Sequence, residues 1–323
     1  MELSKMIKVQ PNWETRHPRL KYMVSKATNL SSWGNTISKT AKYLLLFDLA
    51  FIFLFPFIYM IITSLKSPID VMDITVKWIP STLYVDNYTK AAEMIEYLPT
   101  LLRTAFVTIM ATVGHIIACS MVAYGFARYK FPFKNAIFNV VILTIIIPVQ
   151  VVIISLVIIY SKIGWLNTYL PIILPTFFGF GLRGGLFIFI FRQFFVGLPY
   201  ELEEAARIDG CNAFKTYWKI VLPVAGSALL VCTILSIVWH WNEYFESAMF
   251  IMKPEMLLLP PKLSDLYYWL TVSLNQDMMA AESISLEGTV MAGTFLVILP
   301  ILVVYLFLQK RFMESVERSG LVG

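Results

Sequence analysis

The stretch EEAARIDGCNAFKTYWKIVLP, Glu203–Pro223, is charged and amphipathic, yet it lies between two segments that are apolar enough to cross a membrane. Pro199 and the glutamates that follow it are typical of a helix start, because proline loses nothing in the first turn and negative charge suits the positive end of the helix dipole. Asp209-Gly210 indicates a turn, since glycine accepts the left-handed backbone that ends a helix. The stretch therefore predicts a helix that runs through Ile208, a sharp turn and a second helix.

The second helix of this stretch is expected to be held by aromatic packing. Helical spacing places four large side chains on one face: Phe214, Tyr217, Trp218 and Val221. Ala205 and Ala206 leave the first helix slim enough to enter a groove on another protein. Together, the two helices predict a short, rigid knob.

The composition around this knob is that of a membrane protein. Of the 323 residues, 58% are hydrophobic and 15% are charged, whereas soluble domains carry about a quarter charged residues. A membrane helix needs about 20 mainly apolar residues, and six stretches meet this condition: Tyr43–Leu65, Leu101–Phe126, Ala136–Tyr160, Thr168–Phe191, Val224–Phe245 and Gly288–Leu308. The sequence thus predicts an all-α transmembrane fold of six helices.

The distribution of Lys and Arg orients this fold. Cations are concentrated in the first 42 residues and in alternate connections, so the positive-inside rule places both termini and Glu203–Pro223 in the cytoplasm. The net charge of +5 therefore reflects membrane orientation and not nucleic-acid binding. We expect a basic cytoplasmic extension over residues 1–42, a transmembrane domain over 43–309 and a cytoplasmic tail over 310–323. The extension is either an interfacial helix or a solvated tail.

The predicted fourth span contains LPTFFGFGLRGGLFIFIF, in which Arg183 lies among glycines. Glycine and proline in a spanning helix allow close approach or a local break, and broken helices line substrate cavities in transporters. An arginine at this depth costs at least about 2.5 kcal/mol, so it faces a water-filled cavity or a partner. Arg183 is then either a ligand contact or one half of an ion pair with Glu243 or with a second subunit.

The predicted fifth span ends in WHWNEYF, which contains Trp239, Asn242, Glu243 and Tyr244. Aromatic rings stack on the apolar faces of sugars, and Asn and Glu bind hydroxyl groups, so this mixture suits a saccharide pathway. An interfacial aromatic belt has the same composition. His115, in the second span, is expected to be a packed hydrogen-bond partner and not a proton relay.

EEAARIDG followed by IVLP resembles the cytoplasmic signature loop of binding-protein-dependent ABC importer permeases, in particular the carbohydrate-type, maltose-permease-like group. MVAYGFARYKF, IIIPVQVVIISLVIIYSKIGWLNTYL and SIVWHWNEYF carry the resemblance into the spans. It implies the six-helix type I importer fold, in which this coupling loop, residues 199–223, inserts into a cleft on an ATP-binding subunit. The implied coupling residues are Glu204, Ala205, Ala206, Asp209 and Gly210, with Glu204 paired to a basic residue of that subunit.

The resemblance also implies a function and a set of partners. The chain would be one permease subunit of an ATP-driven importer, forming half of a pathway for a sugar or oligosaccharide by alternating access. Its partners would be a second homologous permease subunit, two ATP-binding subunits, an extracellular or periplasmic solute-binding protein and the lipid of a bacterial inner membrane. ATP and Mg would be bound by the partner subunits, because this chain has no P-loop. Arg183 favours an acidic substrate.

Three other functions were weighed. An ion-coupled secondary transporter should show internal symmetry and carboxylates within its spans, but Asp48 and Glu243 both lie near membrane edges. An ABC importer subunit for a solute other than a sugar stays open. An intramembrane enzyme is disfavoured, because the sequence has no HExxH, no GxSxG and no paired aspartates at metal spacing, and therefore no catalytic or metal site can be assembled.

Overall fold

The computed structural model describes residues 18–181, 183–277 and 286–320, so the first 17 residues of the predicted extension lie outside it. The chain divides into two units, Met1–Tyr59 and Met60–Gly323, which are considered separately. Within the described ranges every regular element is helical and no strand occurs. The all-α fold expected from the sequence is confirmed.

The helices of the described chain, in order, are α3 (Pro18–Ser64), α4 (Pro68–Met72), α5 (Asp86–Met94), α6 (Tyr97–Arg128), α7 (Lys134–Ile146), α8 (Val149–Lys162), α9 (Leu170–Ile173), η2 (Leu174–Phe178), α10 (Gly184–Gly197), α11 (Glu201–Ile208), α12 (Ala213–Thr216), η3 (Tyr217–Val221), α13 (Leu222–Val224), α14 (Gly226–Trp241), α15 (Phe245–Phe250), η4 (Pro254–Met256), α16 (Leu259–Asp277) and α18 (Glu287–Gly320).

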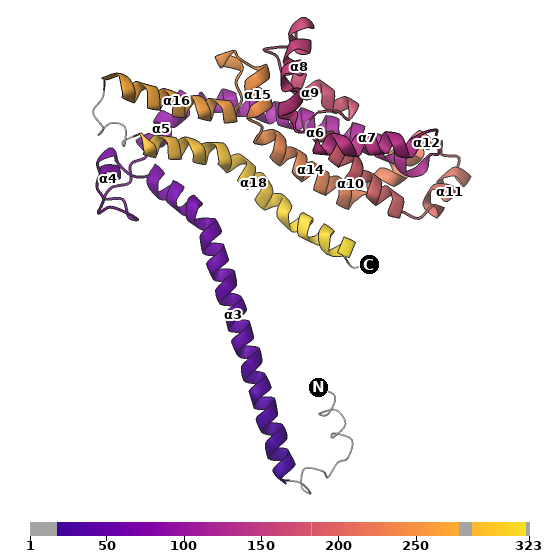
Figure 1. Ribbon diagram of the computed structural model, residues 1–323, viewed down its shortest axis with the longest axis horizontal. Coiled ribbons are helices and arrows are strands. Elements are labelled where there is room, and N and C mark those ends of the chain that lie inside the picture. The colour runs from indigo at the N-terminus through magenta and orange to yellow at the C-terminus, as the bar shows by residue number, and fades with distance from the viewer. Residues whose placement is uncertain (1–17, 182, 278–285, 321–323) are drawn as a thin grey trace. The chain divides into compact units, whose positions relative to one another are not determined.

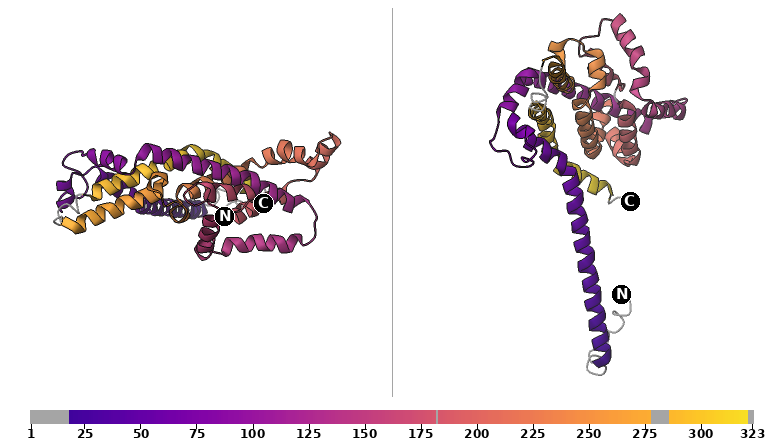
Figure 2. Two further views of the ribbon diagram at one scale, coloured as in Figure 1. Left: turned by 90° about the horizontal axis from the view of Figure 1, so that it is seen from above. Right: turned by 60° about the vertical axis from the view of Figure 1, so that its left-hand side comes forward.

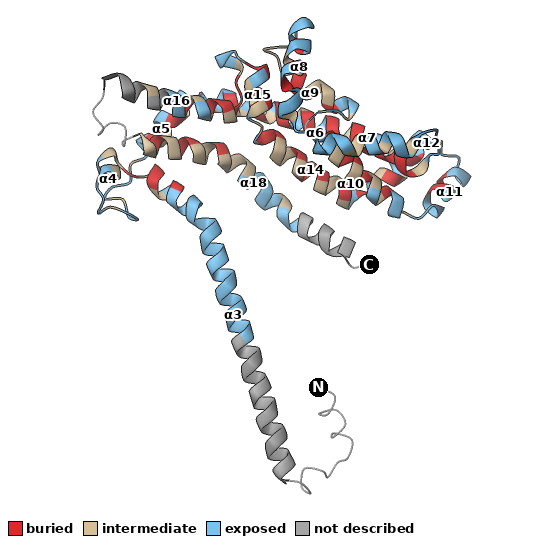
Figure 3. Ribbon diagram, viewed as in Figure 1, coloured by how far each residue is buried: buried red, intermediate tan, exposed pale blue. Residues whose placement is uncertain are grey.

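α3 is one uninterrupted helix of 47 residues, so the expected boundary at residue 42 lies inside it. Its segment Ser38–Ser64 is long and apolar enough to cross a membrane. Within the first unit, the large apolar side chains of this segment are exposed, and Phe47 and Phe53 are among the most open (Figure 3). Lipid or another subunit would remove this apolar surface from water.

Three described helices meet the length and composition of a membrane span: α3, α6 and α18. Three bent pairs meet it when each is counted as one span, which gives up to six. The third predicted span is one of the bent pairs, since α7 and α8 meet at 99°. Pro148 causes the bend because proline disfavours helical backbone in the residue before it, and Ile147 has a ψ of 117°.

The fourth predicted span, Thr168–Phe191, is not one helix. The short turns α9 and η2 are followed by backbone in the left-handed region at Gly179, Gly181 and Arg183, and α10 begins only at Gly184. Of the two outcomes that glycine and proline allow in this span, close approach or a local break, the structure contains the break. Three left-handed residues in five cannot be accommodated in a right-handed helix.

α6 is the centre of the second unit. It packs against α10 and α14, and the three helices run side by side (Figure 1). Their shared core is aromatic and fully buried at Phe187, Phe191 and Phe195. One hydrogen bond joins α14 to α6, since Ser236 Oγ donates to Thr112 Oγ1 at 3.1 Å.

Two helices of the second unit lie to one side of this core. α8 contacts α15, and both project in the same direction in Figure 1 and in the right-hand view of Figure 2. Asn167 ties the segments around them together, because its N–H donates to Phe250 O at 2.8 Å and its side-chain oxygen accepts from Met252 N at 2.7 Å.

The close approach at the break gives a testable prediction. A Cβ at Gly184 would collide with the carbonyl oxygen of Gly179, so Gly184→Ala should destabilise the fold by about 1–3 kcal/mol through overpacking. Gly125, inside α6, has nothing within 4 Å of its virtual Cβ, and Gly125→Ala should stabilise by up to about 1 kcal/mol through helix propensity. Thermal unfolding of both variants in detergent measures the difference; equal melting temperatures would contradict the packing at the break.

Candidate functional site

The coupling loop begins as the sequence predicts. α11 ends at Ile208, and Gly210 has a φ of 79° in the left-handed region. Cys211 N donates to Ala206 O at 2.9 Å and Gly210 N donates to Arg207 O at 3.0 Å, the pair of bonds that defines a Schellman ending. The expected helix and turn are confirmed.

The chain after the turn forms α12 and then η3, a π-helical segment. Asn212 begins it, because its side-chain oxygen accepts from Lys215 N at 2.9 Å. Tyr217 and Val221 are buried, and the Phe214 ring is 61% exposed. The side chains predicted to share one face are therefore not all buried. The wider π-helical turn changes the angular positions of residues from Tyr217 onward.

The residues expected to meet a partner divide between two sides of α11. Glu204, Ala205, Asp209 and Gly210 are exposed, at the end of the second unit where Figure 1 places α11 and α12. Ala206 is 1% exposed and packs inside the chain, so of the two alanines only Ala205 lies on the outer surface. Helical geometry explains the split, because adjacent residues point in directions about 100° apart.

An ion pair that sequence reasoning missed holds α11 to α6. Arg128 Nε lies 2.6 Å from Glu203 Oε1, and the two side chains are only 2% and 5% exposed. Tyr124 Oη donates to the other oxygen of Glu203 at 3.2 Å. Glu203 is interpreted from sequence only as charge near a helix start, and no local pattern connects it with a cation on another helix.

The predicted pathway residues come together partly around Trp239. The Arg183 guanidinium lies 4.1 Å from the Trp239 ring centroid, and the Phe187 ring packs on the same indole at 5.5 Å. Arg183 is exposed, Trp239 is half-buried, and the described ion pairs do not include one between Arg183 and Glu243. Arg183 thus keeps its outer donors available to a ligand or another subunit.

The remaining pathway residues lie at the junction of α14 and α15. Glu243 Oε1 accepts from Glu246 N at 2.9 Å, and the Asn242 amide donates to Val238 O at 2.7 Å within its own turn. Tyr244 Oη lies 3.5 Å from Ser264 Oγ. Asn242 and Tyr244 are exposed, whereas Glu243 is partly used by the backbone of the following helix.

Two buried histidines form a pair that the sequence did not indicate. His240 Nε2 and His115 Nδ1 are 3.1 Å apart, and the rings stack at 5.1 Å. The expectation that His115 is a packed hydrogen-bond partner is confirmed. Its Nε2 lies 3.8 Å from the virtual Cβ of Gly184, so the pair faces the break before α10. Of the described residues, no three His, Cys, Asp or Glu side chains could hold a metal ion together.

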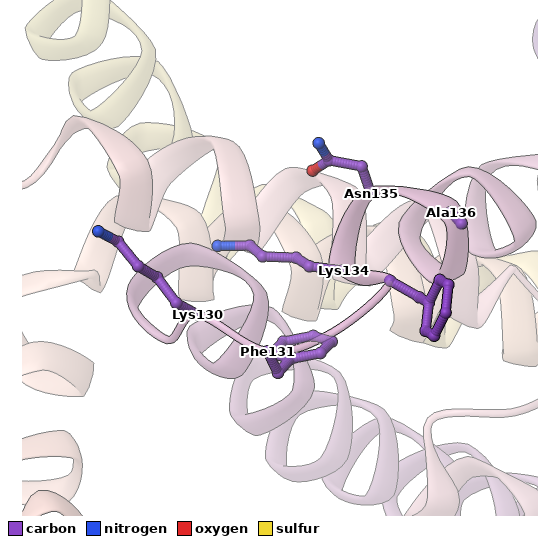
Figure 4. A pocket seen from close by; sticks show the side chains of 6 residues that line it. Lys130, Phe131, Lys134, Asn135 and Ala136 are labelled. Atoms are coloured by element: carbon purple, nitrogen blue, oxygen red, sulfur yellow. The ribbon is translucent and has the colours of Figure 1, made fainter.

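A pocket of about 360 Å³ lies where α6 leads into α7 (Figure 4). Its lining residues are Lys130, Phe131, Phe133, Lys134, Asn135 and Ala136. The two lysine side chains extend in the same direction in Figure 4, and Lys134 Nζ donates to Tyr129 O at 3.0 Å. Phe133 is 81% exposed, as suits an apolar group at a membrane boundary.

The connection between α3 and α5 is folded around polar side chains. Ser81 N donates to Asp70 Oδ2 at 3.0 Å, and Lys66 Nζ donates to Val76 O at 2.8 Å. Hydrogen bonds from Ser81, and then from Ser67, hold the pKa of Asp70 below its usual range. The segment between α3 and α5 therefore has a defined shape that another protein could recognise.

Comparisons with known proteins agree with this architecture. Residues 115–317 match the family model described as "Binding-protein-dependent transport system inner membrane component". An arabinooligosaccharides transport system permease protein from Halalkalibacterium halodurans is 30% identical over 93% of this chain and all of its own length. A probable starch degradation products transport system permease protein from Thermoanaerobacterium thermosulfurigenes is 28% identical over 85% of this chain and 95% of its own.

A solved structure shares the fold. It is a bacterial ABC transporter involved in the import of the acidic polysaccharide alginate, with a TM-score of 0.70 and 23% identity over 86% of this chain and 98% of that one. The likeness shows a shared fold. The apolar helices and the family model together indicate a membrane protein that is a transport component. The chain belongs to the family of binding-protein-dependent transport system inner membrane components.

Proposed function

We propose that this chain forms half of the pathway by which an ATP-driven importer moves a sugar or oligosaccharide across a bacterial inner membrane. The observation that carries the proposal is the coupling loop, whose Glu204, Ala205 and Gly210 are exposed on a rigid turn in a chain of this family. Both termini and this loop face the cytoplasm in the proposal, in agreement with the positive-inside distribution of Lys and Arg.

Docking of the loop on an ATP-binding subunit is supported by its shape and charge. The outer side of α11 combines the small Ala205 with the carboxylate of Glu204, and the Schellman ending fixes the direction in which the loop leaves the helix. A rigid projection loses little conformational entropy on binding. The second permease subunit and the solute-binding protein complete the proposed assembly, with ATP and Mg bound by the ATP-binding subunits.

The proposed substrate pathway passes the break before α10. Arg183 stacks on Trp239, so an aromatic ring and a fork of charged hydrogen-bond donors lie together. Donors of this kind bind hydroxyl and carboxylate oxygens. The oligosaccharide permease from Halalkalibacterium halodurans supports a saccharide substrate. Arg183 supports an acidic one.

Cross-linking tests the docking directly. With Cys211 replaced by Ser, Ala205→Cys should cross-link to an ATP-binding subunit of the purified transporter. Ala206→Cys, one residue further on, should not, because Ala206 is 1% exposed. Mass spectrometry of the cross-linked product identifies the partner, and a product without a nucleotide-binding protein would overturn the proposal.

Glu204→Lys should uncouple the transporter. The reversed charge repels the basic residue expected on the ATP-binding subunit, and like charges across an interface cost several kcal/mol. Uptake should fall at least about tenfold, which corresponds to 1.4 kcal/mol, and so should copurification of the ATP-binding subunits. Glu93→Lys makes the same charge change at an exposed site on α5 and should leave uptake unchanged; normal uptake in Glu204→Lys would contradict the docking.

Arg183→Ala should reduce uptake without affecting assembly. Loss of one stacked, charged contact is worth about 0.5–2 kcal/mol, or about twofold to thirtyfold in uptake. Arg183→Lys keeps the charge but not the planar stack on Trp239, and should recover only part of the rate. Uptake of neutral and acidic oligosaccharides by proteoliposomes measures both, and an unchanged rate in Arg183→Ala would remove this residue from the pathway.

A further inference from the structure

The pair of Arg128 and Glu203 joins the inner end of α6 to α11. We propose that this ion pair is a mechanical joint that makes α6 and α11 move as one body, so that displacement of the coupling loop is passed to α6. The inference rests on the proposed function of that loop. It assigns Arg128, Glu203 and Tyr124 a positioning role, separate from the surface that meets the ATP-binding subunit.

Arg128 holds the start of α11 at three places. Its Nε is 2.6 Å from Glu203 Oε1, its Nη2 donates to Leu198 O at 2.7 Å, and its guanidinium stacks 4.3 Å from the Tyr200 ring centroid. A planar guanidinium can make all these contacts at once, whereas an ammonium group is a point charge. One side chain in the last turn of α6 thus fixes the position and the direction of α11.

The carboxylate of Glu203 is held from a second side. Tyr124 Oη donates to its other oxygen at 3.2 Å, and the Tyr124 ring lies 5.3 Å from the Tyr217 ring. Tyr217 Oη is in turn 2.6 Å from Ser120 Oγ on α6. Consequently, α6 contacts the chain both before the turn at Gly210, through Glu203, and after it, through Tyr217.

The two neighbouring glutamates have different environments. Glu203 is 4% exposed and bound inside the chain, whereas Glu204 is exposed. A buried ion pair adds little net stability compared with apolar residues, but removing one partner is costly, so such pairs fix geometry. Glu203 therefore connects the loop inward, and Glu204 is left to face a partner.

Spin labels measure whether α6 and α11 move together. In the complete reconstituted transporter with Cys211→Ser, labels at Val113→Cys on α6 and Leu202→Cys on α11 use two side chains that are 41% and 39% exposed. With the ion pair intact, the distance distribution between the labels should be narrow and should not change when Mg-ATP is added. A distance that shifts with Mg-ATP in this parent protein would refute the joint.

The test variant is Arg128→Gln/Glu203→Gln, which removes both charges together and leaves no unpaired buried charge. Its distribution should broaden, and it should shift on addition of Mg-ATP. Lys130→Gln removes a cation two residues beyond Arg128, for which the described part of the chain shows no ion pair, and should behave as the parent. A double variant as narrow as the parent would overturn the proposal.

Two further measurements keep the result decisive. If the double variant does not copurify with the ATP-binding subunits, Tyr124→Phe replaces it, because this change removes only the hydroxyl group that holds Glu203. Broadening in Tyr124→Phe supports the joint, and an unchanged distribution refutes it. Absence of the Ala205 cross-link in the parent would refute the proposed function. A retained cross-link, together with a double variant whose distance distribution is as narrow as that of the parent, would refute the joint alone.

Discussion

The burial of opposite charges between α6 and α11 is the constraint on which this end of the second unit depends. Arg128 and Glu203 are almost completely removed from water, and a charge buried without its partner costs about 3–5 kcal/mol. The two helix ends must therefore stay together for either side chain to be tolerated. The chain of contacts through Tyr124 and Tyr217 extends the same requirement across the turn.

The sequence predicts the local features of this region and not the distant ones. The helix through Ile208 and the left-handed Gly210 follow from residue preferences within one turn, and both are correct. The partner of Glu203 lies 75 positions earlier, so no periodicity or turn rule connects the two. The pairing of His115 with His240 is also distant in the sequence, so no local pattern indicates it, although the sequence does predict that His115 is packed.

The length of an apolar segment does not show whether the segment forms one continuous helix. Hydropathy predicts one helix over Thr168–Phe191 because Gly and Phe satisfy the length requirement, but hydropathy carries no information about backbone handedness. The short turns end in left-handed backbone at Gly179, Gly181 and Arg183. α10 begins after these residues. The glycines and the proline of this segment indicate that a break is possible there. The contact between Arg183 and Trp239 depends on how α10 packs against α14, which no local sequence pattern indicates.

The π-helical segment η3 lies in the last part of the coupling loop, shortly before α14. A π-helix uses more residues for each turn than an α-helix does, so five residues in this form rotate the chain through a smaller angle. If Tyr217–Val221 tightened into regular α geometry, everything downstream would twist about the helix axis, because each α-helical residue turns the chain by about 100°. The wider turn thus sets the rotation of the chain about the helix axis as it leaves the coupling loop and enters α14.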